Sequence, residues 1–230
     1  IDTAQAYHNE EGVGNTIRKS DIDAKDFPRI KNMDFQLRLQ KVKASIDKSL
    51  DRLQTDHIDL MLLISRSVTD TVHTALEKVY KEGKLRAIGV SNFYPDHFIY
   101  ITNNMEIVPA VNQVETHVFN QQTEPQKSSA RAYVVETATE GRNGFFTNSI
   151  LAEIGSKYGK SIVQIALRWL IQRGVIIIPK SIHIERMQQN TDISNFELTD
   201  EDMATISTLD MGYSLFFDHY DARTTHMFME

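Results

Sequence analysis

Two cations lie close together near the carboxyl end of the chain, where an apolar run gives way to a helical pattern. Lys180 and Ser181 follow the run 175–178, and Arg186 comes about one helical turn after the start of the next pattern. A lysine at a strand tip, an arginine and the exposed N–H groups of a helix start together favour phosphate binding. The alternative is that both cations are ordinary solvated surface residues. Spacing alone leaves both interpretations open.

Uncharged polar side chains follow two other apolar runs. Ser91 and Asn92 come directly after residues 85–90, and Gln113 lies late in residues 109–114. In parallel α/β proteins the carboxyl ends of the strands meet at one rim, where ligands bind. We therefore expect these side chains to project at the same rim as the cation pair.

The elements that must position these residues alternate along the chain from about residue 36, as in repeated β-α units with a parallel sheet. Purely apolar strands are typical of a barrel interior or of a doubly wound sheet, and periodicity does not choose between them. The predicted strands cover residues 57–64, 85–90, 109–114, 133–137 and 175–178. The predicted helices carry apolar stripes over residues 39–53, 72–80 and 162–170, and a capping box at 199–202 opens another.

The composition is that of one globular domain, residues 1–230, with 41% hydrophobic and 24% charged residues. A net charge of −6 without long blocks of one sign argues against nucleic-acid binding and electrostatic membrane recruitment. No apolar run nears the roughly 18 residues that cross a bilayer. Without cysteine the chain has no disulfide or thiolate metal site; we predict no metal and expect a cytoplasmic protein.

Four segments of the chain closely resemble segments of the aldo-keto reductases, and they occur in the same order as in that family. They are residues 1–12, 87–93 and 111–117, and residues 178–181 together with Arg186. The resemblance spans essentially the whole chain and is strongest with the branch of 2,5-diketo-gluconate and small-aldehyde reductases. It implies a (β/α)8 TIM barrel that binds NADPH without a Rossmann motif and passes a hydride to a small-molecule carbonyl substrate.

The resemblance also implies a reaction centre. Tyr7 matches the tyrosine that protonates the carbonyl oxygen, and Asp2 matches a carboxylate that pairs with an active-site lysine. Lys31 is the candidate for that lysine, whose charge would stabilise the developing tyrosinate. The alternative is that Asp2, Tyr7 and Lys31 are surface polar residues of a loop-rich amino end.

The resemblance divides the expected cofactor contacts into two sets. Hydroxyl and amide side chains suit the uncharged nicotinamide carboxamide, and cations suit the adenosine 2′-phosphate. The nicotinamide set is Ser91, Asn92 and Gln113. The phosphate and adenine set is Lys180, Ser181, Arg186 and Asn190, with Gln189 where the family often has a glutamate.

Two positions depart from the family's pattern. Ile64 stands where the family carries a histidine, and losing one transition-state hydrogen-bond donor commonly costs about 10² to 10³ in rate. Val135 replaces an aromatic that stacks on the nicotinamide, and Glu136 brings a carboxylate toward the pyrophosphate. These departures favour an impaired reductase, with a catalytically inactive NADPH-binding sensor or partner module, or a truncated non-functional reductase, as the alternatives.

The two ends of the chain also carry expectations. Family members have a hairpin, a first strand and its helix before the Asp-Thr-Ala motif, so we expect an incomplete barrel whose first strand and part of whose second are missing. Open sheet edges would then favour self-association. The tail, residues 212–230, corresponds to the family's C-terminal substrate loop.

Overall fold

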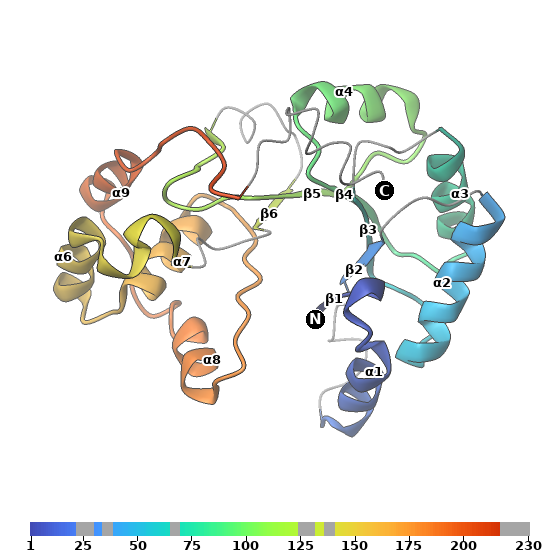
Figure 1. Ribbon diagram of the computed structural model, residues 1–230, viewed down its shortest axis with the longest axis horizontal. Helices are drawn as coiled ribbons and strands as arrows, with labels where there is room; N and C mark the ends of the chain where they lie inside the picture. Colours follow the sequence, from blue (N-terminus) through green and yellow to red (C-terminus); the bar gives the residue numbers. More distant parts are fainter. Residues whose placement is uncertain (22–29, 34–38, 65–69, 124–131, 136–140, 217–230) are drawn as a thin grey trace. The chain divides into compact units, whose positions relative to one another are not determined.

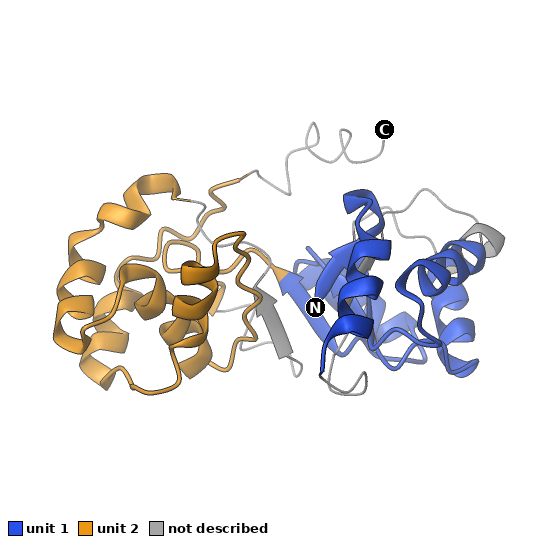
Figure 2. Cartoon of the chain, turned by 90° about the horizontal axis from the view of Figure 1, so that it is seen from below, with its two compact units in different colours: residues 1–113, 225–230 blue, residues 114–224 orange. Residues whose placement is uncertain are grey.

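The computed structural model describes residues 1–21, 30–33, 39–64, 70–123, 132–135 and 141–216 (Figure 1). These residues form two compact units, each with its own hydrophobic core (Figure 2). Unit 1 contains the described residues up to Gln113, and unit 2 contains those from Val114 onward.

Five parallel strands lie side by side in chain order at the centre of unit 1 (Figure 1). The register places Ile64 beside Ser91 and Ser91 beside Gln113, so the two predicted polar positions form one row with Ile64 across three strands. The strands are β1 (Asp2–Ala4), β2 (Ile30–Met33), β3 (Leu60–Ile64), β4 (Ile88–Ser91) and β5 (Val111–Val114).

The helices of unit 1 bury their apolar stripes against one face of this sheet. Met61 and Leu63 of β3 share a core with Ile46 and Leu76, whose helices match the predicted stripes. Burying such side chains stabilises each by about 1.5 to 3 kcal/mol. The helices are α1 (Glu10–Lys19), α2 (Leu39–Leu53), α3 (Asp70–Lys81) and α4 (Pro95–Asn104), with the short 3-10 helix η1 (Gln5–Tyr7).

The other face of the sheet is crowded at Gly89. A Cβ atom there would lie 2.5 Å from the Leu62 side chain and 2.7 Å from that of Val111, so any larger residue would force these side chains to move. Because side chains alternate along a strand, Ser91 and Gln113 belong to this face.

Unit 2 is built mainly of helices around a second core. Leu151, Ile165, Trp169 and Ile206 are completely buried there. The predicted capping box at Thr199 is confirmed. The elements are β6 (Ala132–Val135), the 3-10 helix η3 (Arg142–Thr147), α6 (Ser149–Tyr158), α7 (Ile162–Gln172), α8 (Ile184–Thr191) and α9 (Asp200–Ser207).

The strand predicted over residues 175–178 is wrong. Only Ile176 makes a β-bridge, and its side chain is 47% exposed, whereas Val175 before it is buried. An apolar run has strand propensity, but a strand forms only where a neighbouring backbone pairs with it. The other predicted strands form with shifted bounds: β3 and β4 each begin three residues later than expected.

Candidate active site

The first part of the candidate site is the turn that follows β1. Tyr7 ends helix η1, and its side chain is 61% exposed. His8 after it is in the left-handed region at φ 51°, which ends the helix, and its side chain is exposed. Asp2 begins β1 and is half-buried, five residues before the phenol. The turn therefore presents the Tyr7 phenol just after the carboxyl end of β1, and its role as proton donor stays a prediction.

Gln5 fastens this turn to helix α2. Its amide nitrogen donates to the backbone oxygen of Ser45 at 3.1 Å and to the hydroxyl of Ser49 at 2.9 Å. It also lies within hydrogen-bond distance of the Ser45 hydroxyl. Sequence reasoning did not select Gln5; the signal was a long polar side chain between the small residues Ala4 and Ala6. Gln5 thus positions the turn that carries Tyr7.

The predicted lysine lies on β2. The register aligns Lys31 with Thr3 and Met61, whereas Asp2 is aligned with Ile30. Successive strand positions belong to opposite faces of a sheet, so register alone does not pair Lys31 with Asp2. The Lys31 side chain lies outside the described part of the chain, and its pairing with Asp2 stays a prediction.

The predicted nicotinamide residues meet at the ends of β4 and β5. Ser91 is completely buried, and the backbone N–H of Asn92 donates to the Gln113 backbone oxygen at 2.8 Å. Asn92 has φ 60°, and its amide nitrogen lies 3.4 Å from the Ser91 hydroxyl. The buried Oε1 of Gln113 has no hydrogen-bond partner among the described residues. An unpaired buried acceptor costs about 1 to 3 kcal/mol, so this oxygen suits a ligand that brings an N–H donor.

Asn112 holds this region in place. Its side-chain nitrogen donates to the Phe93 backbone oxygen at 2.6 Å, and its Oδ1 lies 3.4 Å from the Phe93 backbone nitrogen. Asn112 is buried, so these bonds are shielded from water. The polar pair Asn112-Gln113 in an apolar strand was visible in the sequence, but only the structure shows that Asn112 clamps the loop after Ser91.

The predicted phosphate residues lie in unit 2. Helix α8 begins four residues after Lys180, and the backbone N–H of His183 donates to the Ser181 hydroxyl at 3.1 Å. Arg186 lies in the first turn of α8. It shares a helix face with Gln189 and Asn190, which come three and four residues later.

Lys180 and Arg186 are both exposed, and neither forms an ion pair with a carboxylate in the described part of the chain. Two cations beside a helix start are therefore available to an anion. The difference from the prediction is that Lys180 follows a loop rather than a strand.

The two residues that depart from the family's pattern, Ile64 and Val135, both lie at the ends of strands. Ile64 ends β3 and is aligned with Ser91, and Val135 ends β6. The side chains of both residues and all of Glu136 lie outside the described residues. The row across β3, β4 and β5 therefore offers a hydroxyl and an amide but no imidazole. In the described residues no cluster of three His, Cys, Asp or Glu side chains could hold a metal ion, and no helix is long and apolar enough to span a bilayer.

Comparison with known proteins decides the family. Residues 1–137 and 126–211 match the family model described as "Aldo/keto reductase family". Glyoxal reductase of Bacillus subtilis (strain 168) is 40% identical over 214 residues, which are 91% of this chain and 78% of that protein. This chain belongs to the aldo/keto reductase family. The resemblance inferred from the four segments is confirmed, and the protein is an oxidoreductase by family.

Solved structures agree with this assignment. A protein classed as a 2,5-diketo-D-gluconic acid reductase B superposes with a TM-score of 0.88 at 34% identity, covering 94% of this chain and 80% of that one. An aldo-keto reductase of the silkworm, Bombyx mori, complexed with NADPH superposes with a TM-score of 0.86 at 28% identity, covering 93% of this chain and 74% of that one. The predicted fold class, an α/β TIM barrel of aldo-keto reductase type, is confirmed by these neighbours.

Proposed function

We propose that this aldo/keto reductase reduces a small aldehyde, ketone or diketone to an alcohol with NADPH as the hydride donor. Members of this family use NADPH, and the silkworm structure contains it. The name of the Bacillus relative, glyoxal reductase, supports a small dicarbonyl substrate. The observation that carries the proposal is in unit 1, where an exposed phenol follows β1 and the buried amide oxygen of Gln113 has no partner within the described part of the chain.

Two sets of residues would hold the cofactor, which supplies a hydride to the carbonyl carbon when bound. Gln113 Oε1 would accept a hydrogen bond from the carboxamide, with Ser91 and Asn92 completing the contacts. In unit 2 Lys180 and Arg186 would form charge-assisted bonds to the 2′-phosphate. The Ser181 hydroxyl would add a neutral one, and Gln189 and Asn190 would lie toward the adenine. Because NADH lacks the 2′-phosphate, we expect a preference for NADPH.

Tyr7 would supply the proton. Its O–H bond breaks as the carbonyl oxygen takes the proton, while the carbonyl carbon gains the hydride, so the carbonyl becomes an alcohol and a tyrosinate remains. A phenol with an ordinary pKa near 10 gives up its proton reluctantly at neutral pH. A neighbouring cation would stabilise the tyrosinate, and this is the role proposed for Lys31, with Asp2 as its partner.

Replacement of the phenol tests this proposal. Tyr7→Phe should lower kcat by about 10² to 10⁴, because the variant keeps the ring and loses the acidic proton. NADPH consumption on methylglyoxal gives kcat, and a fluorescence titration gives the Kd of NADPH, which should not change. Tyr100→Phe on α4, also an exposed tyrosine, is the matched control. Equal turnover by wild type and Tyr7→Phe would remove Tyr7 from the mechanism.

A second candidate function is an NADPH-binding sensor or partner module without turnover. It is favoured by Ile64 at the position where the family carries a histidine and by Val135 in place of the stacking aromatic. Tight NADPH binding without consumption on methylglyoxal or a diketone would support this module. Failure to bind NADPH at all would contradict both candidates.

A further inference from the structure

Helix α8, which carries Arg186, lies entirely within the described residues and buries no side chain in the second core. None of its residues, Ile184–Thr191, is buried, whereas α6, α7 and α9 each contribute buried side chains. The apolar side chains of Ile184 and Met187 are 69% and 45% exposed. An isolated helix of eight residues is only marginally stable in water. The position of Arg186 therefore depends on the contacts that join α8 to the rest of unit 2.

Asp192, directly after α8, joins the helix to α7 and to the turn before α7. Its backbone N–H donates to the Gln188 oxygen at 3.0 Å, which ends the helix. Its backbone oxygen accepts from Lys160 Nζ at 3.2 Å and from the Gln164 amide nitrogen at 3.0 Å. Its carboxylate accepts from Lys160 Nζ at 2.7 Å and from the Asn195 amide nitrogen at 2.8 Å. Asp192 thus fastens the end of α8 through both its backbone and its side chain.

The partners of Asp192 belong to the packed part of unit 2. Gln164 is buried in the first turn of α7 and completes a capping box with Ser161. The Lys160 side chain is 11% exposed, and its Nζ lies 5.3 Å from the centre of the Phe196 ring. An ion pair whose cation is largely shielded from water is screened less than a fully exposed pair. The hydrogen bond from Lys160 lowers the pKa of Asp192 below its ordinary value, so the carboxylate is ionised at neutral pH.

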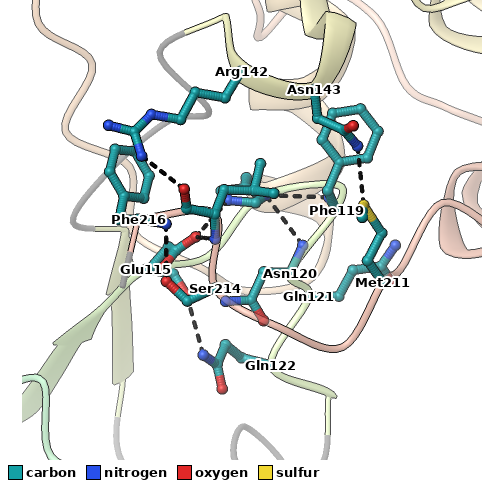
Figure 3. Close-up of polar contacts among 12 residues, drawn as sticks. Glu115, Phe119, Asn120, Gln121, Gln122, Arg142, Asn143, Met211, Ser214 and Phe216 are labelled. Atoms are coloured by element: carbon teal, nitrogen blue, oxygen red, sulfur yellow. Dashed lines mark hydrogen bonds and ion pairs between the residues drawn. The ribbon is translucent and has the colours of Figure 1, made fainter. Parts of the chain in front are cut away.

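Two other carboxylates of unit 2 hold segments that also have core contacts. Glu115 accepts from the backbone N–H of Leu215 at 2.9 Å (Figure 3), and the Leu215 side chain packs against the second core. Asp202 lies in α9, whose Ile206 is completely buried. Loss of either carboxylate would leave this apolar packing in place. Because residues 184–191 contribute no buried side chain, α8 depends more strongly on Asp192.

The two ends of α8 are attached differently. At the first turn, the N-cap residue His183 makes no side-chain capping bond to a described residue. At the other end, Ile193 directly after Asp192 is buried and holds the chain at that point. One apolar contact does not fix the direction of a helix, whereas hydrogen bonds are directional. The bonds of Asp192 therefore set the tilt of α8 about its carboxyl end.

A change in this tilt would move the cation of α8. Arg186 precedes Asp192 by six residues, which is about 9 Å along a helix. A tilt of about 10° would shift the Arg186 backbone by about 1.5 Å, which is about half the length of a charge-assisted hydrogen bond. Gln189 and Asn190 lie closer to the fixed end and would move less. The bonds that Arg186 can make to an anion are therefore the most sensitive to the tilt.

We propose that Asp192, held by Lys160 and Gln164, is a positioning residue for the 2′-phosphate end of NADPH, because it sets the tilt of α8 and thereby the place of Arg186. This inference rests on the proposed function, in which Arg186 binds that phosphate, and it applies to the reductase and to the sensor module alike. Because NADH lacks the 2′-phosphate, loss of Asp192 should weaken NADPH binding far more than NADH binding. A general loss of stability would weaken both equally.

Amide hydrogen exchange measures how firmly α8 is held and needs neither cofactor nor activity. In Asp192→Ala and in Lys160→Met, exchange at residues 188–191 should become about tenfold faster, because each variant removes bonds at the helix end. The double variant should exchange no faster than the faster single variant, since both act through one contact. Glu197→Ala, whose carboxylate pairs with Arg168 at 3.2 Å and is 83% exposed, is the matched control and should leave exchange there unchanged. Unchanged exchange in both single variants would overturn the proposal.

Binding titrations measure the effect on the cofactor. In both single variants the Kd of NADPH and that of 2′,5′-ADP, which carries the same phosphate, should rise about tenfold. The Kd values of NADH and 5′-AMP should stay within about twofold of wild type. Lys160→Arg keeps a cation for Asp192 and should bind NADPH as the wild type does. Equal weakening of NADPH and NADH, or no weakening of NADPH, would overturn the positioning role.

The positioning role and the proposed function fail in different ways. If the wild type binds NADPH and the variants bind it equally tightly, Asp192 has no positioning role and the proposed function stands. If the wild type binds neither NADPH nor 2′,5′-ADP, the proposed function has failed and the positioning role fails with it.

Discussion

At the scale of single residues, the candidate site offers side chains suited to cofactor contacts, and the proposed reaction centre departs from the expected pattern at Ile64. The buried Gln113 oxygen and the exposed cations Lys180 and Arg186 are all suited to ligand contacts. The end of β3 carries an isoleucine where the family carries a histidine, beside Ser91 in the register. The binding residues and the proton-transfer residues can therefore be tested separately by substitution.

Ile64→His should raise kcat on methylglyoxal by about 10² if the chain is an impaired reductase, because an imidazole restores a hydrogen-bond donor at the reacting oxygen. Steady-state rates of NADPH consumption measure this gain. The Kd of NADPH should not change, which separates a catalytic gain from a binding gain. Lack of any gain in a folded Ile64→His variant would favour the sensor module.

At the scale of elements, long-range polar contacts hold the segments that carry the site. Gln5 fastens the turn of Tyr7 to α2, and Asn112 clamps the loop after β4. In unit 2 Asp202 ties α9 to α6, because it accepts hydrogen bonds from Lys157 at 2.8 Å and from the Tyr158 hydroxyl. Each contact joins segments that are distant in the chain. Loss of one such contact should therefore displace a turn, loop or helix without unfolding it.

Gln5→Leu tests the turn. It removes the donor to Ser45 and Ser49, each bond contributing about 1 kcal/mol, and does not change the Tyr7 side chain itself. We expect kcat on methylglyoxal to fall about tenfold, because misplacement of a reacting group by about 1 Å lowers the rate strongly. The Kd of NADPH should be that of the wild type. A changed Kd with an unchanged kcat would mean that Gln5 acts on the cofactor rather than on Tyr7.

The lowered pKa of the Asp202 carboxyl group predicts that the stability of the protein depends on pH. Burial by itself would raise its pKa, but the bonds from Lys157, Tyr158 and Thr199 outweigh burial and lower the pKa to about 2. A carboxyl group whose pKa is lower in the folded state stabilises the fold at pH values above its unfolded-state pKa. This stabilisation is lost as the pH falls through its folded-state pKa. The free energy of unfolding should therefore fall by about 1 to 2 kcal/mol between pH 4 and 2, after allowance for solvent screening.

Urea unfolding followed by fluorescence of the buried Trp169 measures this loss in unit 2. Asp202→Asn should be less stable at pH 5 and should lose less stability on acidification. Asp200→Asn, at an exposed position in the first turn of α9, is the matched control and should behave as the wild type. A wild-type stability that is constant from pH 5 to 2 would contradict the assignment.

At the scale of the whole molecule, the described residues divide into two units with separate cores, whereas the composition predicts one domain. The prediction of one domain implies that both units unfold together, as small single domains usually do. Trp169, the single tryptophan, reports on unit 2, and far-ultraviolet circular dichroism reports on the helices of both units. Coincident urea midpoints would support one domain, and two separate midpoints would contradict it.

The predicted self-association is tested at the same scale. Open sheet edges present unpaired backbone groups that can pair with another chain. Sedimentation velocity over a hundredfold range of protein concentration should therefore show a species of higher mass as concentration rises. A single species with the mass of one 26.4 kDa chain at every concentration would contradict self-association.

Local patterns predicted α2, α3, α7, the start of α9 and the strands β3 to β6, because an apolar stripe or an apolar run reflects burial within one segment. Helices α1, α4 and α6 were not predicted. The stripes at α2 and α3 and the capping box at Thr199 needed no tertiary information. The family was likewise inferred from residue types and their order along the chain and is confirmed, whereas the roles of the candidate site residues stay predictions.

Pairing between distant segments was decided only by the tertiary structure. The apolar run at residues 175–178 looks like the other strands, yet it lacks their regular pairing. Glu115 and Leu215 are a hundred residues apart, and no periodicity relates them. The reason is physical: a local pattern records whether a segment is buried, whereas hydrogen bonds between segments depend on which backbones and side chains the fold brings together.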